Sequence, residues 1–273
     1  SDQDLDTAWG VGQARGPRLP LVLIPTTAGT GSEVTPVAIL TVEAQEKRGI
    51  VSPHLLPDLA FLDPTLTLGL PPAATAATGV DAMVHAIEAY TSRSPNANPI
   101  SRMLAVTALQ KLGAAIERAV HEGENLGARS EMLLGSMLAG QAFANAPVAA
   151  VHALAYPIGG LFHVPHGLSN ALILAPVLRF NASEAGAEYA ALAPQVFPQI
   201  TGGGTQEVAA NFIEALEALS RRLGLPPRLR DVDIPADAVP KMAAEAMKQT
   251  RLLVNNPRPL AQADAQTIYE AAW

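Results

Sequence analysis

Two segments of the chain contain side chains that could together hold a metal ion. In the first, Asp81 and His85 are four residues apart, and on a helix this spacing places both on one face, with Cβ atoms roughly 5–6 Å apart. In the second, His152, His163 and His166 place three of the chain's six histidines within fifteen positions. One carboxylate with two or three imidazoles suits Fe²⁺ or Zn²⁺, whereas Mg²⁺ and Ca²⁺ prefer more oxygen ligands. The sequence therefore predicts a site for one divalent cation.

Each of these features also has an ordinary structural interpretation. An Asp-x-x-x-His pair by itself is more often a surface or capping arrangement, and His163 by itself is more typical of a hydrogen-bonded wall residue. His54 and His121 stand among loop or helix-end residues and are expected to be solvated. Only the combination of the two segments favours a metal site.

Composition narrows the chemistry and the possible partners. The chain contains no cysteine, which excludes disulfides, thiolate metal ligands and cysteine nucleophiles. A net charge of −7 without any run of Lys or Arg offers no surface for phosphates, so no nucleic-acid partner is expected. No apolar run reaches the ~18 residues of a membrane span, and no signal peptide is visible in residues 1–4. We therefore expect a globular, cytoplasmic protein without membrane contact.

The elements that must position these residues begin with a few short strands. Residues 19–24 form an apolar run that Pro25 ends, a pattern typical of a buried strand in a parallel sheet. Residues 37–42 and 59–62 indicate two further strands, and residues 49–51 are a weaker candidate between them. All of the predicted strands lie in the first quarter of the chain.

Helical patterns fill the rest of the sequence. From Pro71 onward, Ala, Leu, Glu and Met recur with helical spacing, and turns rich in Gly or Pro divide this part into about eight helices. The boundary falls near residue 70, in a stretch with turn chemistry. We therefore expect a small α/β portion over residues 1–70 and an all-helical domain over residues 71–273.

Four segments of the chain resemble the iron-type, or group III, alcohol dehydrogenase family in their order and spacing. They are Pro25-Thr26-Thr27-Ala28-Gly29-Thr30-Gly31-Ser32-Glu33, the Ser-Pro, Leu-Pro-Asp and Asp-Pro turns of residues 52–64, Gly79-Val80-Asp81 through Tyr90, and His152 to Asn170. The resemblance implies a dehydroquinate-synthase-like fold, α/β plus all-α. Residues 1–70 would be the C-terminal part of a truncated dinucleotide-binding domain, because the family's GGGSxxD pyrophosphate turn is absent. Residues 71–273 would be its multi-helical, metal-binding catalytic domain.

The resemblance also selects the metal ligands. In the family, the metal is held by the aspartate and histidine of a GxDAxxHAxE helix and by two later histidines fourteen residues apart, a separation that His152 and His166 reproduce. It therefore implies Asp81, His85, His152 and His166 as ligands and leaves His163 outside the set. The implied metal is Fe²⁺, with Zn²⁺ as the alternative.

A loop rich in Thr and Gly follows the first predicted strand. Such a loop exposes backbone N–H groups and hydroxyls and lets a phosphate or ribose approach closely, although a Thr/Gly turn by itself is more often only a turn. In the family this loop lines the dinucleotide cleft, and a lysine lies near the cofactor. The resemblance therefore implies that Thr26, Thr27, Thr30 and Lys47 contact NAD or NADP.

The function that the resemblance implies is hydride transfer between a nicotinamide and a small alcohol, aldehyde or ketone, with the metal polarising the substrate oxygen. Phe162 is a candidate apolar wall for the substrate and fits a core residue equally well. Tyr156 stands where many family members carry a histidine suggested to relay protons, so no catalytic residue is assigned, and a phenol, water or His163 could serve. Family members commonly form homodimers, which the composition permits.

Other functions fit parts of the pattern. Maleylacetate-type reductases and reductases of 2-oxo or hydroxy acids share the architecture, but the maleylacetate pattern lacks a carboxylate like that of Asp81. A metal-dependent hydrolase would need a general base, for which Glu88 is a weak candidate because it is expected to face elsewhere on its helix. A helical module without catalysis of its own is the remaining alternative.

Overall fold

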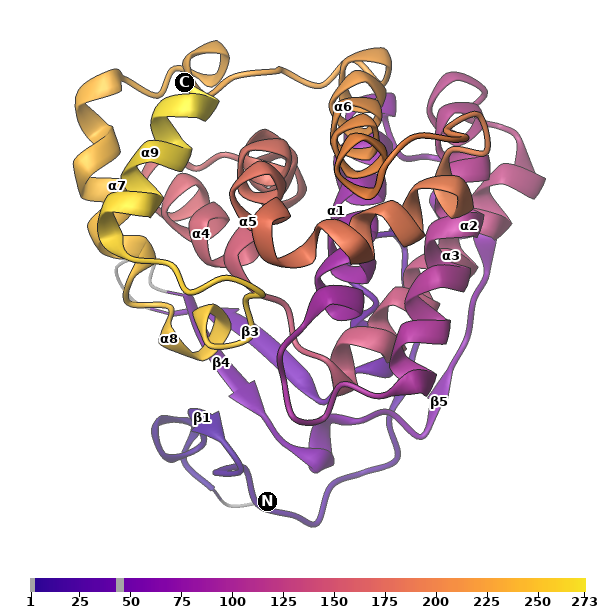
Figure 1. Cartoon of the computed structure of the whole chain (residues 1–273). Helices are drawn as coiled ribbons and strands as arrows, with labels where there is room; N and C mark the ends of the chain where they lie inside the picture. Colours follow the sequence, from indigo (N-terminus) through magenta and orange to yellow (C-terminus); the bar gives the residue numbers. More distant parts are fainter. Residues whose placement is uncertain (1–2, 43–46) are drawn as a thin grey trace.

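Helices account for most of the protein, as Figure 1 shows for the computed structural model, which describes residues 3–42 and 47–273 apart from the side chains of Thr41 and Lys47. The described part contains nine α-helices, one more than expected, and α8 has only four residues. Within this part, no helix combines the length and the hydropathy of a membrane span. The helices are α1 (Pro72–Thr91), α2 (Pro99–His121), α3 (Leu126–Asn145), α4 (Ala150–Phe162), α5 (His166–Val196), α6 (Thr205–Arg222), α7 (Val239–Ala246), α8 (Thr250–Leu253) and α9 (Gln262–Ala272).

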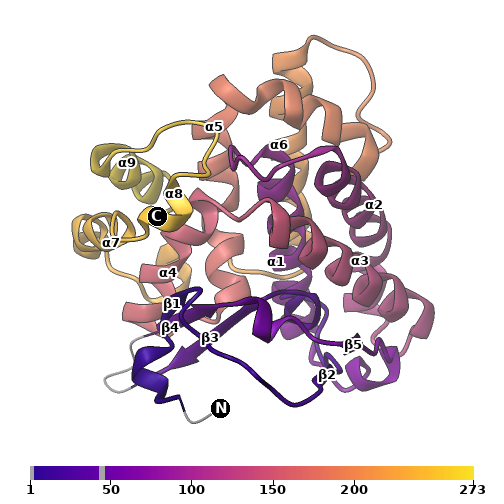
Figure 2. The ribbon, with the colours of Figure 1, turned by 90° about the horizontal axis from the view of Figure 1, so that it is seen from below.

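Two small sheets precede the helices, and Figures 1 and 2 place their strands together on one side of the helical body. One sheet has the order β1-β4-β3, parallel between β1 and β4 and antiparallel between β3 and β4, and β2 and β5 form a separate parallel pair. The strands expected at residues 37–42, 49–51 and 59–62 are present with slightly different ends. The strands are β1 (Gly10–Val11), β2 (Val22–Leu23), β3 (Val37–Thr41), β4 (Lys47–Val51) and β5 (Leu59–Ala60).

The prediction of a buried strand at residues 19–24 is wrong in length and in burial. β2 contains only two residues, and the side chains of Val22 and Ile24 are 51% and 52% exposed. The strand is parallel, as expected, but among the described strands its one neighbour is β5. An apolar, β-branched run predicts burial only where other elements cover the strand, and the described elements leave this one open.

α1 is the central helix of the protein. Nearly all of residues 75–89 are buried, and α1 packs against α2, α3 and α5. Small residues permit this close packing, since a side chain at Gly79 would collide with Met132 of α3 and Ile116 of α2. Because neighbouring helices surround α1, its polar side chains lie inside the protein.

α4 and α5 meet at a sharp turn that brings both of them to the central part of the bundle. α4 ends at Phe162, and His163 caps it with a left-handed φ of 57°. α5 begins at His166, directly after Pro165, whose fixed φ suits the start of a helix. α5 packs against both α4 and α1. The turn therefore carries the histidines of α4 and α5 toward the buried face of α1.

Gly167→Ala should destabilise the protein, because the added methyl group would meet the Ala77 carbonyl oxygen of α1. Pushing α5 away from α1 should cost on the order of 1–3 kcal/mol of unfolding free energy. Gly186→Ala in the same helix is the matched control, since no atom lies within 4 Å of its added Cβ, and it should be neutral or stabilise by roughly 0.5–1 kcal/mol. Urea unfolding measures both variants, and equal stabilities would contradict this account of the packing.

Candidate metal centre

α1 presents three ionisable side chains to the interior of the protein. Asp81, His85 and Glu88 follow one another at spacings of four and three residues, so they share one helical face, and all three are buried. The expectation that Glu88 faces elsewhere is wrong, because a helical face returns at the seventh residue after its first member. The helix therefore brings two carboxylates and one imidazole to the same region of the core.

Hydrogen bonds fix the orientation of two imidazole rings. His85 Nδ1 lies 3.2 Å from the Gly29 carbonyl oxygen, and His152 Nδ1 lies 2.6 Å from Glu88 Oε2. Because a carbonyl and a carboxylate only accept, both Nδ1 atoms carry hydrogen, and in the neutral rings both Nε2 atoms carry a lone pair. The second Glu88 oxygen accepts the Val151 N–H at 2.7 Å. Glu88 therefore holds His152 both by its ring and by the adjoining backbone.

The two Nε2 atoms of His85 and His152 face each other at 3.0 Å. When both rings are neutral, two lone pairs at this distance repel each other, and either a proton on His152 Nε2 or a cation shared by both rings removes the conflict while the Nδ1 hydrogen bonds remain intact. Imidazole nitrogen with carboxylate oxygen is a donor set for a borderline divalent ion. The residues present therefore fit a metal ion at this point.

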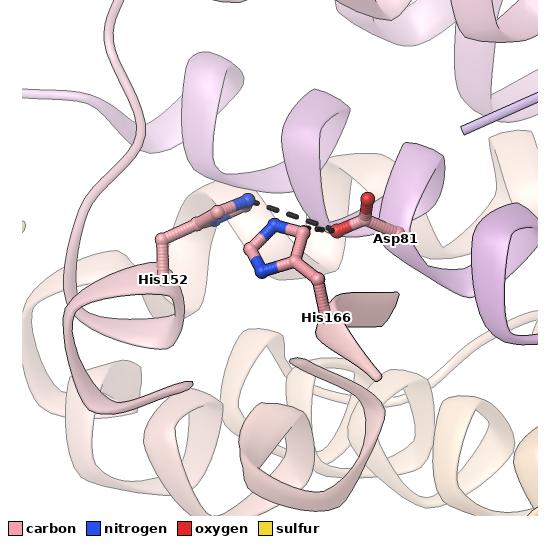
Figure 3. Close-up of side chains that lie close together, drawn as sticks. All are labelled: Asp81, His152 and His166. Carbon is pink, nitrogen blue, oxygen red and sulfur yellow. Dashed lines mark ion pairs between the residues drawn. The ribbon is translucent and has the colours of Figure 1, made fainter. Parts of the chain in front are cut away.

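The remaining donors surround the same point. One ligand atom each from Asp81, His152 and His166 lies within 4.8 Å of the other two. Figure 3 shows both rings pointing toward the carboxylate, and each Nε2 lies 3.7 Å from Asp81 Oδ1. Asn170, one helical turn after His166, donates to Asp81 Oδ1 at 2.5 Å, and its own buried Oδ1 accepts no hydrogen bond from the described residues. The structure therefore brings the four expected ligands together, with His85 joining the group beside His152.

Burial and charge act against each other in this cluster. Burial raises the pKa of Asp81, but the nearby histidines and the Asn170 hydrogen bond outweigh it and hold that pKa below its usual range. Burial lowers the pKa of His85 to about 3 against the attraction of Asp81. For His152, burial also lowers the pKa, but the Glu88 carboxylate outweighs it and the net pKa is raised. An ionised Asp81 and a neutral His85 are the protonation states that can bind a cation.

A cavity of about 530 Å³ opens onto the cluster between the strands and the helices. Phe143 of α3 stacks on the His85 ring with centroids 4.6 Å apart, and the Tyr156 ring lies 6.2 Å from the His166 ring. Apolar walls with a few converging polar groups are typical of a small-molecule site. The other apolar lining residues include Val37, Ile39, Val51, Val148 and Leu252.

The Thr/Gly loop touches this site at three positions. Thr30 and Ser32 line the cavity, and the Gly29 carbonyl oxygen holds His85. Thr26 and Thr27 are not among the residues that line it. The side chain of Lys47 lies outside the described residues. The loop expected to line a dinucleotide cleft is therefore hydrogen-bonded to the candidate metal cluster.

Three other expectations concern residues outside the cluster. His54 and His121 are exposed, as predicted. His163 is also exposed and does not line the cavity, which agrees with its place outside the ligand set. Phe162 packs partly buried against the core and does not line the cavity, so its prediction as a substrate wall is wrong and its alternative as a core residue is correct. Phe143, on a different helix, lines the cavity.

Two family models match the chain. One is described as the C-terminal part of the Fe-containing alcohol dehydrogenase family and matches residues 75–273, and the other is described as iron-containing alcohol dehydrogenase and matches residues 3–64. The chain belongs to the iron-containing alcohol dehydrogenase family. The resemblance drawn from four segments is confirmed, as is the fold class of a small α/β part followed by a large helical part.

Relatives and solved structures support this membership of the iron-containing alcohol dehydrogenase family. Long-chain-alcohol dehydrogenase 1 of Geobacillus thermodenitrificans is 44% identical over 259 residues, which are 93% of this chain and 64% of that protein. The structure of a 1,3-propanediol oxidoreductase superposes with a TM-score of 0.95 at 39% identity, over 100% of this chain and 71% of the other. The structure of a sulfoacetaldehyde reductase from Bifidobacterium kashiwanohense in complex with NAD⁺ superposes with a TM-score of 0.86 at 30% identity, over 100% of this chain and 70% of the other. The chain thus spans less than two thirds of the first relative, and the expected family is confirmed.

Glu88→Gln tests whether the carboxylate supports His152 as a ligand. The amide can still accept the Val151 N–H, but it replaces the charged acceptor at His152 Nδ1, so the affinity for Zn²⁺ should fall by about 10–100-fold. Glu131→Gln, which removes a surface pair with Lys111, is the control and should keep the full affinity. Calorimetric titration of Zn²⁺ into the metal-free proteins measures the change. Full affinity in Glu88→Gln would show that Glu88 does not support the ligand.

Proposed function

We propose that Asp81, His85, His152 and His166 together hold one divalent cation, Fe²⁺ or Zn²⁺. The observation that carries this proposal is the 3.0 Å approach of two Nε2 atoms whose outer ring nitrogens are both occupied. The adjacent Asp81 carboxylate supplies negative charge. Both ions accept imidazole and carboxylate ligands, and membership of an iron-containing family favours iron.

We further propose that the protein interconverts a small alcohol and its aldehyde or ketone with NAD or NADP. Family membership, the names of the relatives and the NAD⁺ complex of the sulfoacetaldehyde reductase support this reaction. The nicotinamide would exchange a hydride with the substrate carbon, and the cation would stabilise negative charge on the substrate oxygen. Thr26, Thr27, Thr30 and Lys47 are the proposed contacts of the dinucleotide, of which Thr30 lines the cavity.

The chain's own side chains would keep water out of the cavity and orient the substrate within it. Phe143 shields one face of the His85 ring from water, and Val148 and Leu252 extend the apolar wall. Such surroundings strengthen electrostatic interactions with the reacting atoms. Burial raises the pKa of the Tyr156 phenol, so at neutral pH this group can donate a hydrogen bond but cannot act as a base.

Two alternative functions lose support. Glu88 does face the cluster, but one of its oxygens accepts from Val151 and the other holds His152, so it offers no free carboxylate as the general base of a hydrolase. Asp81 belongs to the candidate cluster, whereas the pattern of maleylacetate-type reductases lacks such a carboxylate. Dehydrogenation of an alcohol is therefore the better proposal.

The position of the cavity supports a division of the chain into two domains with different roles. We propose residues 1–70 as the end of a dinucleotide-binding domain and residues 71–273 as the metal-binding domain. The cavity is lined from both parts, as hydride transfer between a dinucleotide and a substrate at the metal would require. A cytoplasmic homodimer without a nucleic-acid partner stays a prediction from composition and resemblance.

His166→Ala should lose both bound metal and alcohol-dependent reduction of NAD⁺ or NADP⁺, because it removes a proposed ligand. We expect a loss of metal affinity on the order of 100-fold, measured by metal analysis, and the loss of the rise in nicotinamide absorbance. His163→Asn is the control, since His163 is exposed and its left-handed φ suits asparagine. A His166→Ala protein that kept stoichiometric metal and activity would refute the ligand assignment.

Removal of metal with a chelator should lower the melting temperature, because a ligand that binds only the folded protein stabilises it. Zn²⁺ at one hundred times its dissociation constant should restore about 2.7 kcal/mol of unfolding free energy. The same addition should leave His166→Ala almost unchanged. Identical melting curves of the intact protein with and without Zn²⁺ would speak against a metal in this cluster.

A further inference from the structure

Arg251 is the one arginine or lysine among the described residues that line the cavity. It belongs to α8, next to the buried Leu252, which lines the same wall. The Asn255 side-chain amide donates to the Arg251 carbonyl oxygen at 3.1 Å and to the Val148 carbonyl oxygen at 3.2 Å. Because Val148 also lines the cavity, the backbone of Arg251 is held at a defined place on its rim.

The Arg251 guanidinium makes no ion pair or side-chain hydrogen bond with the described residues, whereas other exposed arginines do. Arg179 and Arg221 pair with Glu217, and Arg222 pairs with Glu117. Arg251 is exposed and reaches a cavity whose walls are largely apolar. A cation in this position, without an ion-pair partner among the described residues, is suited to an anionic group on a bound small molecule.

Arg251 shares the cavity with the metal cluster. It lines the same cavity as Tyr156, His85, His152 and His166. The Tyr156 ring in turn lies 6.2 Å from the His166 ring. A short molecule with one end at the cluster can therefore present its other end to Arg251.

We propose that Arg251 binds a carboxylate at the far end of the substrate, so that this chain favours short hydroxy acids and their aldehyde acids over neutral alcohols. This inference rests on the proposed oxidation of alcohols and specifies its substrate class. A guanidinium binds a carboxylate through two parallel hydrogen bonds, which give orientation as well as affinity. With the carboxylate at the rim, the hydroxyl end points into the cavity toward His85, His152 and His166.

The probes are 4-hydroxybutyrate and 1,4-butanediol, which have the same length and differ in one terminal group. Calorimetric titration of the zinc-loaded protein without dinucleotide should show about tenfold tighter binding of 4-hydroxybutyrate. This preference should disappear in Arg251→Gln at unchanged zinc content. Arg228→Gln removes an exposed arginine outside the cavity and should retain the preference. Equal affinities in the unchanged protein, or a preference that survives Arg251→Gln, would overturn the proposal.

A phosphate of the dinucleotide is the other possible source of an anionic group, and ADP-ribose separates the two. If Arg251 serves the substrate, Arg251→Gln should bind ADP-ribose as tightly as the unchanged protein. Weaker ADP-ribose binding with the 4-hydroxybutyrate preference retained would overturn the proposal. Reduction of NAD⁺ by 1,4-butanediol is measured separately. If the protein prefers the carboxylate but does not reduce NAD⁺, the proposed oxidation is contradicted and the role of Arg251 in binding is not.

Discussion

The structure depends on providing hydrogen-bond and charge partners for ionisable side chains that are buried in a helical core. Asp81, His85, Glu88 and His152 are all buried, and a buried ionisable group is costly unless a partner compensates it. The partners come from other elements: the Gly29 carbonyl oxygen from the Thr/Gly loop for His85, and Glu88 of α1 for His152 of α4. A shift of any of these elements would leave a buried group without its partner, so the cluster and the packing of α1, α4 and the loop constrain each other.

Close backbone contact is the second condition, and glycine provides it on both sides of the cluster. Gly31 adopts a left-handed φ of 57°, and a side chain there would collide with the backbone of Gly140 in α3. Gly167 has the corresponding role between α5 and Ala77 of α1. The loop proposed to contact the dinucleotide therefore rests directly on the helices, and its Gly29 reaches His85. The same contacts position the proposed cofactor loop and the metal cluster.

Local periodicity was sufficient for the parts of the fold and site that lie within one element. It located most of the strands, the start of the helical region and the shared face of Asp81 and His85. The same helical spacing, applied further along α1, would have found Glu88. Applied to α5, it would have found Asn170 one turn after His166. No local pattern could place α4 and α5 beside α1, and only the family resemblance suggested that their histidines meet α1. Phe143 was missed for the same reason, since its contact with His85 joins two helices distant in sequence.

In the proposed oxidation of an alcohol, water would carry the released proton better than a side chain of this chain would. Tyr156 keeps its proton because burial raises its pKa, and His163 is exposed at the end of α4, outside the cavity. His166 differs from the other proposed ligands because its side chain is 35% exposed. A second cavity, of about 510 Å³, shares Tyr156 and His166 with the first. Water can therefore approach the cluster at His166 from this second cavity, so the proposed reaction would not depend on the histidine that Tyr156 replaces.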